Sequence, residues 1–169
     1  MHYQFESIHP FLDGNGRMGR ILMILFLLLS KKLTYPILYI SEYINKHRTE
    51  YYDILRRTSE LADYSAIIKF MLNAVIEQAK KTQQQLVEIK RIMDEKQTLI
   101  KKILPNSHEI TQQFFNHPFI GITKFADNIG LSRQTASKYL STLTKEKIIS
   151  EIQIGKSKVY FMPEFINLL

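Results

Sequence analysis

A dozen residues near the start of the chain concentrate side chains that could handle a phosphate group. Residues 9–20 read His-Pro-Phe-Leu-Asp-Gly-Asn-Gly-Arg-Met-Gly-Arg. Gly14 and Gly16 permit positive backbone φ and a close approach to a ligand, and Asn15 tolerates the same conformations. The residues that follow are expected to be helical, so unpaired N–H groups and the positive end of a helix dipole would lie at this loop. The segment therefore predicts an anion-binding site.

The charged and titratable side chains of the segment suit a phosphate and a metal ion. Arg17 and Arg20 lie three residues apart, on one face of a helix that begins near Gly16, and each guanidinium offers paired donors to phosphate oxygens. Asp13 supplies the hard oxygen ligand that Mg²⁺ bound to phosphates requires. Histidine is the residue type that suits a general base near neutral pH, and His9 is the histidine of this segment. These residue types indicate phosphoryl-type transfer, in which the protein mainly positions groups and stabilises charge.

The segment resembles the signature of the Fic family, H-x-F-x-[DE]-G-N-G-R-x-x-R, and matches it at every specified position. The similarity continues in the next expected helix, at residues 38–41, Tyr43, Arg48, Tyr51 and Tyr52. Most of this family transfers AMP from ATP to a hydroxyl group of a target protein. The resemblance therefore implies a protein adenylyltransferase that uses ATP and Mg²⁺ and has a protein bearing a Ser, Thr or Tyr hydroxyl as its partner.

Carried over residue by residue, the resemblance assigns roles within the motif. His9 would deprotonate the incoming hydroxyl, and Asp13 would hold Mg²⁺. The two loop glycines and the asparagine between them would form the anion hole, and the two arginines would bind the β- and γ-phosphates. This phosphate-binding set consists of Gly14, Asn15, Gly16, Arg17 and Arg20. Pyrophosphate would then leave in line with the attacking oxygen.

Composition limits the class of protein. The chain has 169 residues, of which 45% are hydrophobic and 23% charged, enough for one medium domain and a small one. It has no cysteine, which excludes disulfides and thiolate metal sites and suits the cytoplasm. Residues 21–29 are all apolar but fall short of the ~20 residues that cross a bilayer, so we expect a buried helix there and no membrane association. The N-terminus has no signal-peptide pattern.

The expected fold is mainly α-helical, with a Fic-type helical bundle and a small α+β domain. Residues 1–62 would form the C-terminal portion of the Fic catalytic domain, truncated because the family places several helices and a β-hairpin flap before the motif. Without those elements we expect transfer by this chain to be impaired. Residues 63–105 would form a long helix, stopped by Pro105, that packs on the Fic core and links the domains. Its apolar residues from Ile68 to Ile103 follow a heptad-like spacing that could also pair two copies of the chain.

Residues 106–169 are expected to form a winged helix-turn-helix domain. A short amphipathic helix ends at Gly130, and Ser132 is a good N-cap for a second helix. Two β-like runs follow, at residues 148–154 and 157–162, and glycine between them permits a tight hairpin. This order of elements resembles the winged helix-turn-helix domains that many Fic proteins carry.

If this domain binds DNA, its second helix would lie in the major groove and its hairpin would contact the backbone. The expected contacts are Arg133, Gln134, Ser137 and Lys138 on the helix, with Lys156 and Lys158 on the hairpin. The whole chain carries a net charge of +7, but residues 106–169 hold seven Lys and Arg against five Asp and Glu. Because this local excess is small, a protein-docking or dimerisation module stays open.

Three functions remain open at the level of sequence. The first is AMP transfer. The second is a winged-helix DNA-binding regulator whose Fic part is non-catalytic or sensory. The third is phosphorylation of a target, as in the related death-on-curing branch, but that branch departs from Gly-Asn-Gly in the anion hole, so Gly16 favours AMP transfer.

Overall fold

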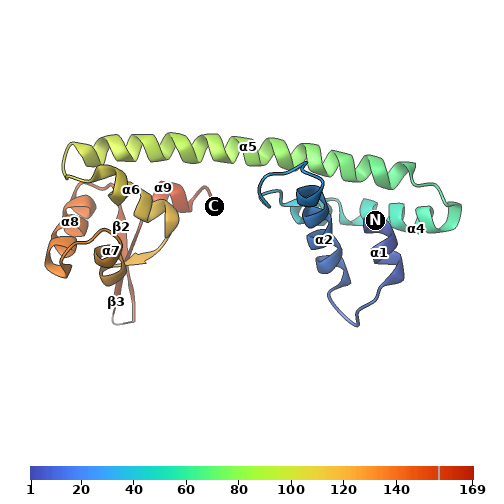
Figure 1. The fold of residues 1–169 in the computed structure, drawn as a ribbon, viewed down its shortest axis with the longest axis horizontal. Helices are drawn as coiled ribbons and strands as arrows, with labels where there is room; N and C mark the ends of the chain where they lie inside the picture. The colour runs from blue at the N-terminus through green and yellow to red at the C-terminus, as the bar shows by residue number, and fades with distance from the viewer. Residues whose placement is uncertain (156) are drawn as a thin grey trace. The chain divides into compact units, whose positions relative to one another are not determined.

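Helices dominate the described part of the chain, and the strands found there lie in its C-terminal half. The computed structural model describes residues 1–155 and 157–169. It divides into an N-terminal unit, Met1–Gln84, and a C-terminal unit, Gln85–Leu169 (Figure 1). The expected fold class, mainly α with a small α+β part, is confirmed.

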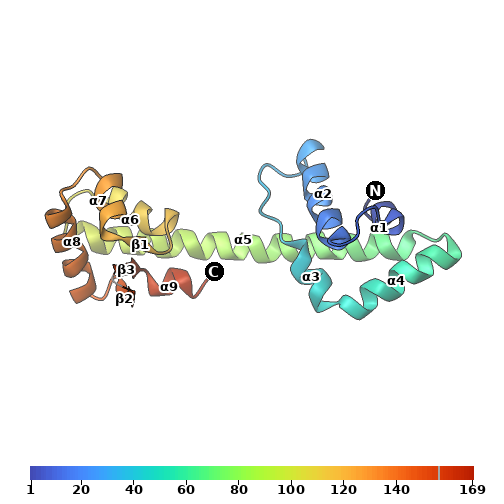
Figure 2. The ribbon, with the colours of Figure 1, turned by 90° about the horizontal axis from the view of Figure 1, so that it is seen from below.

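The N-terminal unit consists of α1 (His2–Ile8), α2 (Asn15–Leu29), α3 (Ile40–Lys46), α4 (Arg48–Leu61) and the first part of α5 (Ser65–Lys101). Helices α1 and α2 pack against each other and are joined by the loop of residues 9–14 (Figure 2). The core lies around Phe70 of α5, which the rings of Tyr43 and Tyr51 approach at centroid distances of 5.3 and 5.6 Å. Such aromatic pairs add to the stabilisation that burial provides, so they fix α3 and α4 against α5.

Helix α5 buries only part of the seam that its heptad-like spacing predicts. Ile68, Leu72 and Leu86 of the predicted seam are about half exposed. The buried side chains are Ile67, Phe70, Ala74, Gln78, Ile92, Lys96 and Ile100, of which Ile100 belongs to the predicted seam. Because Gln78 and Lys96 are polar, apolar spacing alone does not predict that these positions are buried. Lys96 is buried because its ammonium pairs with the carboxylate of Glu164.

The apolar run at residues 21–29 forms most of α2 but is only partly buried. Met23 lies in the core, whereas Leu25, Phe26 and Leu29 are exposed. The expectation of a buried helix is therefore wrong for most of this run, because elements of the unit pack against only one side of α2. Across the described residues, no helix is both long enough and apolar enough to span a bilayer.

The C-terminal unit contains the end of α5, α6 (Ser107–Asn116), β1 (Ile120–Gly121), α7 (Ile122–Asn128), α8 (Arg133–Lys145), β2 (Ser150–Ile154), β3 (Ser157–Phe161) and α9 (Pro163–Ile166). The strands pair antiparallel in the order β1-β3-β2. Ile120 lies opposite Tyr160, and Ile152 lies opposite Val159. Two helices followed by a hairpin is the order that the sequence predicts.

Local chemistry explains the turns of this unit. Gly130 adopts a φ of 67° between α7 and α8, and Gly155 a φ of 59° after β2, a region that glycine enters without steric cost. The Ser132 hydroxyl accepts a hydrogen bond from the Thr135 N–H at 3.1 Å and so caps α8, as predicted. These elements close over a core of fully buried side chains that includes Phe114, Phe125, Leu140, Leu143 and Met162.

Candidate functional site

The loop between α1 and α2 is built on two residues in the left-handed region. His9 ends α1 with a φ of 49°, and its backbone N–H donates to the Phe5 carbonyl at 3.1 Å. Gly14 precedes α2 with a φ of 81°. A non-glycine residue with positive φ costs free energy and persists only when surrounding contacts hold it. The loop geometry therefore depends on what braces it.

Asn15 is that brace. Its side chain is 2% exposed; Oδ1 accepts the Phe11 N–H at 2.9 Å, and Nδ2 donates to the Phe11 carbonyl at 2.6 Å. One buried amide thus satisfies both backbone groups of Phe11 and closes the loop. The sequence predicts Asn15 in the anion hole without this bracing role, which leaves its backbone N–H as the group that could face an anion.

The first turn of α2 provides donors for an anion. The first hydrogen bond of this helix runs from the Met18 N–H to the Gly14 carbonyl at 2.9 Å. The N–H groups of Asn15, Gly16 and Arg17 precede it, so they have no acceptor within α2. These groups and the dipole of a 15-residue helix create a positive potential at the predicted anion site.

Asp13 and Arg17 form an exposed pair at the mouth of this loop. Asp13 Oδ1 accepts the Gly14 N–H at 2.6 Å, and Oδ2 lies 3.2 Å from Arg17 Nη2. The two side chains are 91% and 73% exposed, and such a pair contributes roughly 0–1 kcal/mol. Both can therefore exchange this contact for a metal ion and a phosphate at little cost.

The fit to Mg²⁺ rests on the carboxylate of Asp13. Within residues 1–155 and 157–169, no group of three or more His, Asp or Glu side chains is placed to hold a metal ion. Mg²⁺ bound to phosphates commonly takes only one or two protein carboxylates and keeps several waters. A single exposed carboxylate beside an anion site fits that mode of binding.

Arg20 is held differently from Arg17. Its Nε donates to the Ser41 hydroxyl of α3 at 2.9 Å, and its Nη1 lies 3.2 Å from the position that a Cβ on Gly16 would occupy. Glycine at position 16 therefore leaves room for the guanidinium. Arg17, Arg20 and Ser41 open into a hollow of about 440 Å³ whose other walls are mostly apolar. The sequence predicts both arginines, but it gives no sign of the Ser41 contact.

His9 carries the ring expected to act as a base. It is exposed, and its Nδ1 lies 3.3 Å from the Glu6 carbonyl oxygen. In the tautomer with the proton on Nδ1, this contact orients the ring and leaves the Nε2 lone pair directed elsewhere. A ring held through one nitrogen can accept a proton at the other.

A buried polar cluster that the sequence does not predict joins α1 and α4. His2 Nε2 lies 2.9 Å from the Tyr51 hydroxyl, and His2 Nδ1 lies 3.9 Å from Glu6 Oε1. The Glu6 carboxylate rests directly against the α-carbon of Gly19, which is possible only because that residue has no side chain. Burial lowers the pKa of His2, an effect partly opposed by Glu6, and burial raises the pKa of Tyr51.

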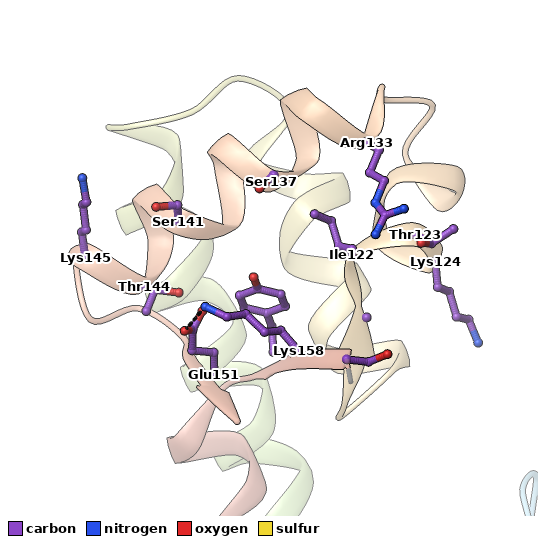
Figure 3. Close-up of a pocket in the computed structure, with 13 residues that line it drawn as sticks. Ile122, Thr123, Lys124, Arg133, Ser137, Ser141, Thr144, Lys145, Glu151 and Lys158 are labelled. Carbon is purple, nitrogen blue, oxygen red and sulfur yellow. Dashed lines mark hydrogen bonds and ion pairs between the residues drawn. The ribbon is translucent and has the colours of Figure 1, made fainter. Parts of the chain in front are cut away.

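A second polar site lies in the C-terminal unit. A cleft of about 830 Å³ is bounded by α8, the start of α7 and the strands β2 and β3 (Figure 3). Its cations are Lys124, Arg133, Lys145 and Lys158. Its hydroxyl groups belong to Thr123, Ser137, Ser141, Thr144, Ser157 and Tyr160. The ammonium of Lys158 donates to the Glu151 carboxylate at 2.6 Å, and this contact raises the pKa of Lys158.

The predicted DNA contacts divide between two sides of α8. Arg133, Ser137 and Lys158 line the cleft. Gln134 and Lys138 are exposed but line a separate hollow together with Ile103 and Leu104. Lys156 lies outside the described residues. Other residues that line the cleft are not among the contacts predicted from the sequence; they include Lys124 of α7 and, in the second half of α8, Ser141, Thr144 and Lys145.

Comparison with known proteins finds two families along the chain. Residues 1–27 match the Fic/DOC family, and residues 92–165 match the family described as protein adenylyltransferase SoFic-like, C-terminal domain. A protein adenylyltransferase Fic of Aedes aegypti is 39% identical over 70 residues, which are 41% of this chain and 13% of that protein. A Fido domain-containing protein of Dictyostelium discoideum is 48% identical over 65 residues, which are 36% of this chain and 45% of that protein. The chain thus spans less than half the length of either relative.

Proposed function

The chain belongs to the Fic family, and we propose that the protein transfers AMP from ATP to a hydroxyl group of a target protein. The observation that carries this proposal is the arrangement around the loop of residues 9–14. Helix α1 ends at His9, and the first turns of α2 present N–H groups without an acceptor in the helix together with Arg17 and Arg20. Preorganised donors beside a base are what transfer at a phosphorus atom requires of a protein.

In the proposed reaction His9, Asp13 and the groups at the start of α2 have separate tasks. His9 accepts the proton of the target hydroxyl as its oxygen attacks the α-phosphorus, and the bond from that phosphorus to pyrophosphate breaks. The N–H groups at the start of α2, with Arg17 and Arg20, stabilise the negative charge on the phosphates. Asp13 is the carboxylate that would hold Mg²⁺, which neutralises phosphate charge when bound.

Labelled nucleotide tests this proposal. The protein is incubated with cell extract and ATP labelled either at the α- or at the γ-phosphate, and label on protein is measured. We expect that label added by the protein, relative to extract alone, comes from α-labelled ATP only and is at least a hundredfold less with His9→Ala, since general-base catalysis contributes roughly 10²–10⁴-fold. Equal labelling by His9→Ala, or label from the γ-phosphate alone, would contradict AMP transfer.

A second candidate function, DNA binding, is favoured by the surface of α8. The exposed side chains of this helix are Arg133, Gln134, Ser137, Lys138, Ser141 and Lys145. Together these side chains provide three cations, amide and hydroxyl groups, and no carboxylate. The cleft beside it adds the ammonium of Lys124. Cations and polar groups on an exposed helix next to a hairpin suit the phosphates and base edges of a duplex.

A salt series tests this second candidate. The whole chain is titrated with duplex DNA at several salt concentrations, and we expect affinity to fall steeply as salt rises. Arg133→Ala and Lys145→Ala should each weaken binding and lower the slope of log affinity against log salt by about one. Lys102→Ala removes the same charge from an exposed position outside the cleft and serves as the control. Binding that is absent, or equally weakened by all three variants, would contradict the assignment.

A further inference from the structure

The two motif arginines are anchored by chemically different groups. Arg17 contacts a carboxylate, that of Asp13, on an exposed surface. Arg20 is anchored by a neutral group, because its Nε donates to the Ser41 hydroxyl at 2.9 Å. Among the described residues, no carboxylate oxygen lies within 4.0 Å of its guanidinium nitrogens. A hydroxyl acceptor fixes one edge of a guanidinium without neutralising its charge, so both Nη groups keep their full attraction for an anion.

The position of Ser41 is fixed by the core. Ser41 lies in the first turn of α3, between residues whose side chains are buried: Leu38, Ile40, Tyr43 and Ile44. These neighbours anchor α3, so the hydroxyl is presented to α2 from a rigid element. Arg17, Arg20 and Ser41 line the same hollow. A donor held from a second helix keeps its orientation better than one held only by its own flexible stem.

A competing acceptor for Arg20 also lies near Gly16. The position that a Cβ on Gly16 would occupy is 3.2 Å from Arg20 Nη1 and 4.0 Å from Glu6 Oε2. The other Glu6 oxygen is buried, with no hydrogen-bond partner among the described residues. A partly buried carboxylate with one unpaired oxygen favours contact with a cation. If Arg20 turned toward Glu6, the resulting ion pair would cancel the charge needed at the anion site.

We propose that Ser41 is a positioning residue whose hydroxyl holds the Arg20 guanidinium toward the hollow and away from Glu6. The inference rests on the proposed nucleotide site, in which Arg20 binds a terminal phosphate of ATP. Loss of the hydroxyl lets the guanidinium rotate toward Glu6, and the site then binds polyphosphate less well. AMP lacks the β- and γ-phosphates, so its binding does not depend on this arrangement.

Calorimetry with the magnesium complex of ATP, and separately with AMP, tests the proposal on the full chain. Ser41→Ala should weaken ATP binding by about fivefold to tenfold, as expected for the loss of one ordinary hydrogen bond, and change AMP binding less than about twofold. Ser41→Thr keeps the hydroxyl and should stay close to the wild type. Equal weakening of ATP and AMP, or a threonine variant as weak as the alanine variant, would overturn the proposal.

The role of Glu6 can be isolated by a double-mutant cycle. Glu6→Gln removes the competing negative charge while preserving the shape of the side chain. In that background, Ser41→Ala should weaken ATP binding by less than about twofold, because the guanidinium no longer has an ion pair to form. An effect of Ser41→Ala that is the same with Glu6 and with glutamine would show that Glu6 does not compete for Arg20.

A nucleotide-free measurement separates this proposal from the proposed function. The Nε–H proton of Arg20, observed by NMR, should exchange slowly with solvent in the wild type and in Ser41→Thr, and at least about tenfold faster in Ser41→Ala. Rapid exchange in the wild type would overturn the positioning role. Slow exchange in a wild-type chain that binds no ATP would support the hold of Ser41 on Arg20 and refute the nucleotide assignment.

Discussion

At the scale of single residues, the motif depends on one buried amide. Asn15→Ala removes both hydrogen bonds to Phe11 and leaves its backbone N–H and carbonyl without their partner. Because Phe11 is half exposed and water can replace part of the loss, we expect the free energy of unfolding to fall by about 1–3 kcal/mol. Urea denaturation measures this change. Asn15→Asp, which keeps an acceptor but no donor, should lie between the alanine variant and the wild type, and an unchanged alanine variant would show that the loop does not need the brace.

The buried His2 predicts a dependence of stability on pH. Burial lowers its pKa below the usual value of 6.5, and Glu6 only partly opposes this effect. As pH falls through about 6.5, His2 takes up a proton in the unfolded chain but not in the folded chain. Protonation therefore stabilises the unfolded state, and the free energy of unfolding falls. The contribution to stability is therefore complete above about pH 6.5 and is lost as pH falls through the folded-state pKa.

Thermal unfolding between pH 8 and pH 5 checks this prediction. We expect the midpoint of the wild type to fall more steeply below pH 6.5 than that of His2→Gln, which keeps a polar side chain and does not titrate. Parallel pH profiles for the two chains would mean that the protonation of His2 is not linked to folding.

At the scale of elements, the contact between α1 and α2 depends on Gly19. Alanine for glycine within a helix normally stabilises it by roughly 0.5–1 kcal/mol. A Cβ on Gly19 would instead overlap the buried Glu6 carboxylate, so Gly19→Ala should destabilise the unit by about 1–3 kcal/mol despite the better helix propensity. Gly16→Ala is the matched control in the same helix, because its Cβ would meet the flexible end of Arg20 at 3.2 Å and would lie 4.0 Å from Glu6 Oε2, an ordinary van der Waals distance.

Chemical denaturation of the two alanine variants distinguishes crowding from a general effect on α2. The Gly16 variant should unfold near the wild-type midpoint, and adding Glu6→Ala should offset part of the loss in the Gly19 variant. Equal destabilisation by both glycine substitutions would show that the Glu6 contact is not the cause.

Local signals in the sequence predict the turns and the motif, whereas contacts between residues far apart in the sequence could not be predicted. Gly14 and Ser132 could be predicted because a helix start depends on the residue itself and its immediate neighbours. The contact of Ser41 with Arg20 joins residues 21 positions apart, and that of His2 with Tyr51 joins residues 49 apart. No pattern of spacing encodes such pairs. For the same reason the heptad-like spacing predicts only part of the buried face of α5, since the partners of a helix decide which apolar side is covered.

At the scale of the whole chain, each unit has its own hydrophobic core. Phe70 belongs to the core of Met1–Gln84, and Phe125 to that of Gln85–Leu169. Each phenylalanine is 3% exposed or less, so Phe125→Ala and Phe70→Ala should each cost about 3–5 kcal/mol in the unit that contains them. This is a large share of the stability of a small domain.

Hydrogen exchange followed by mass spectrometry tests whether that cost stays local. Phe125→Ala should speed amide exchange within residues 85–169 and leave residues 1–84 close to the wild type, and Phe70→Ala should do the reverse. Because the motif loop lies in the first unit, the Phe125 variant should also keep its affinity for ATP. Faster exchange throughout the chain in both variants would mean that the two cores unfold as one cooperative unit, joined through α5.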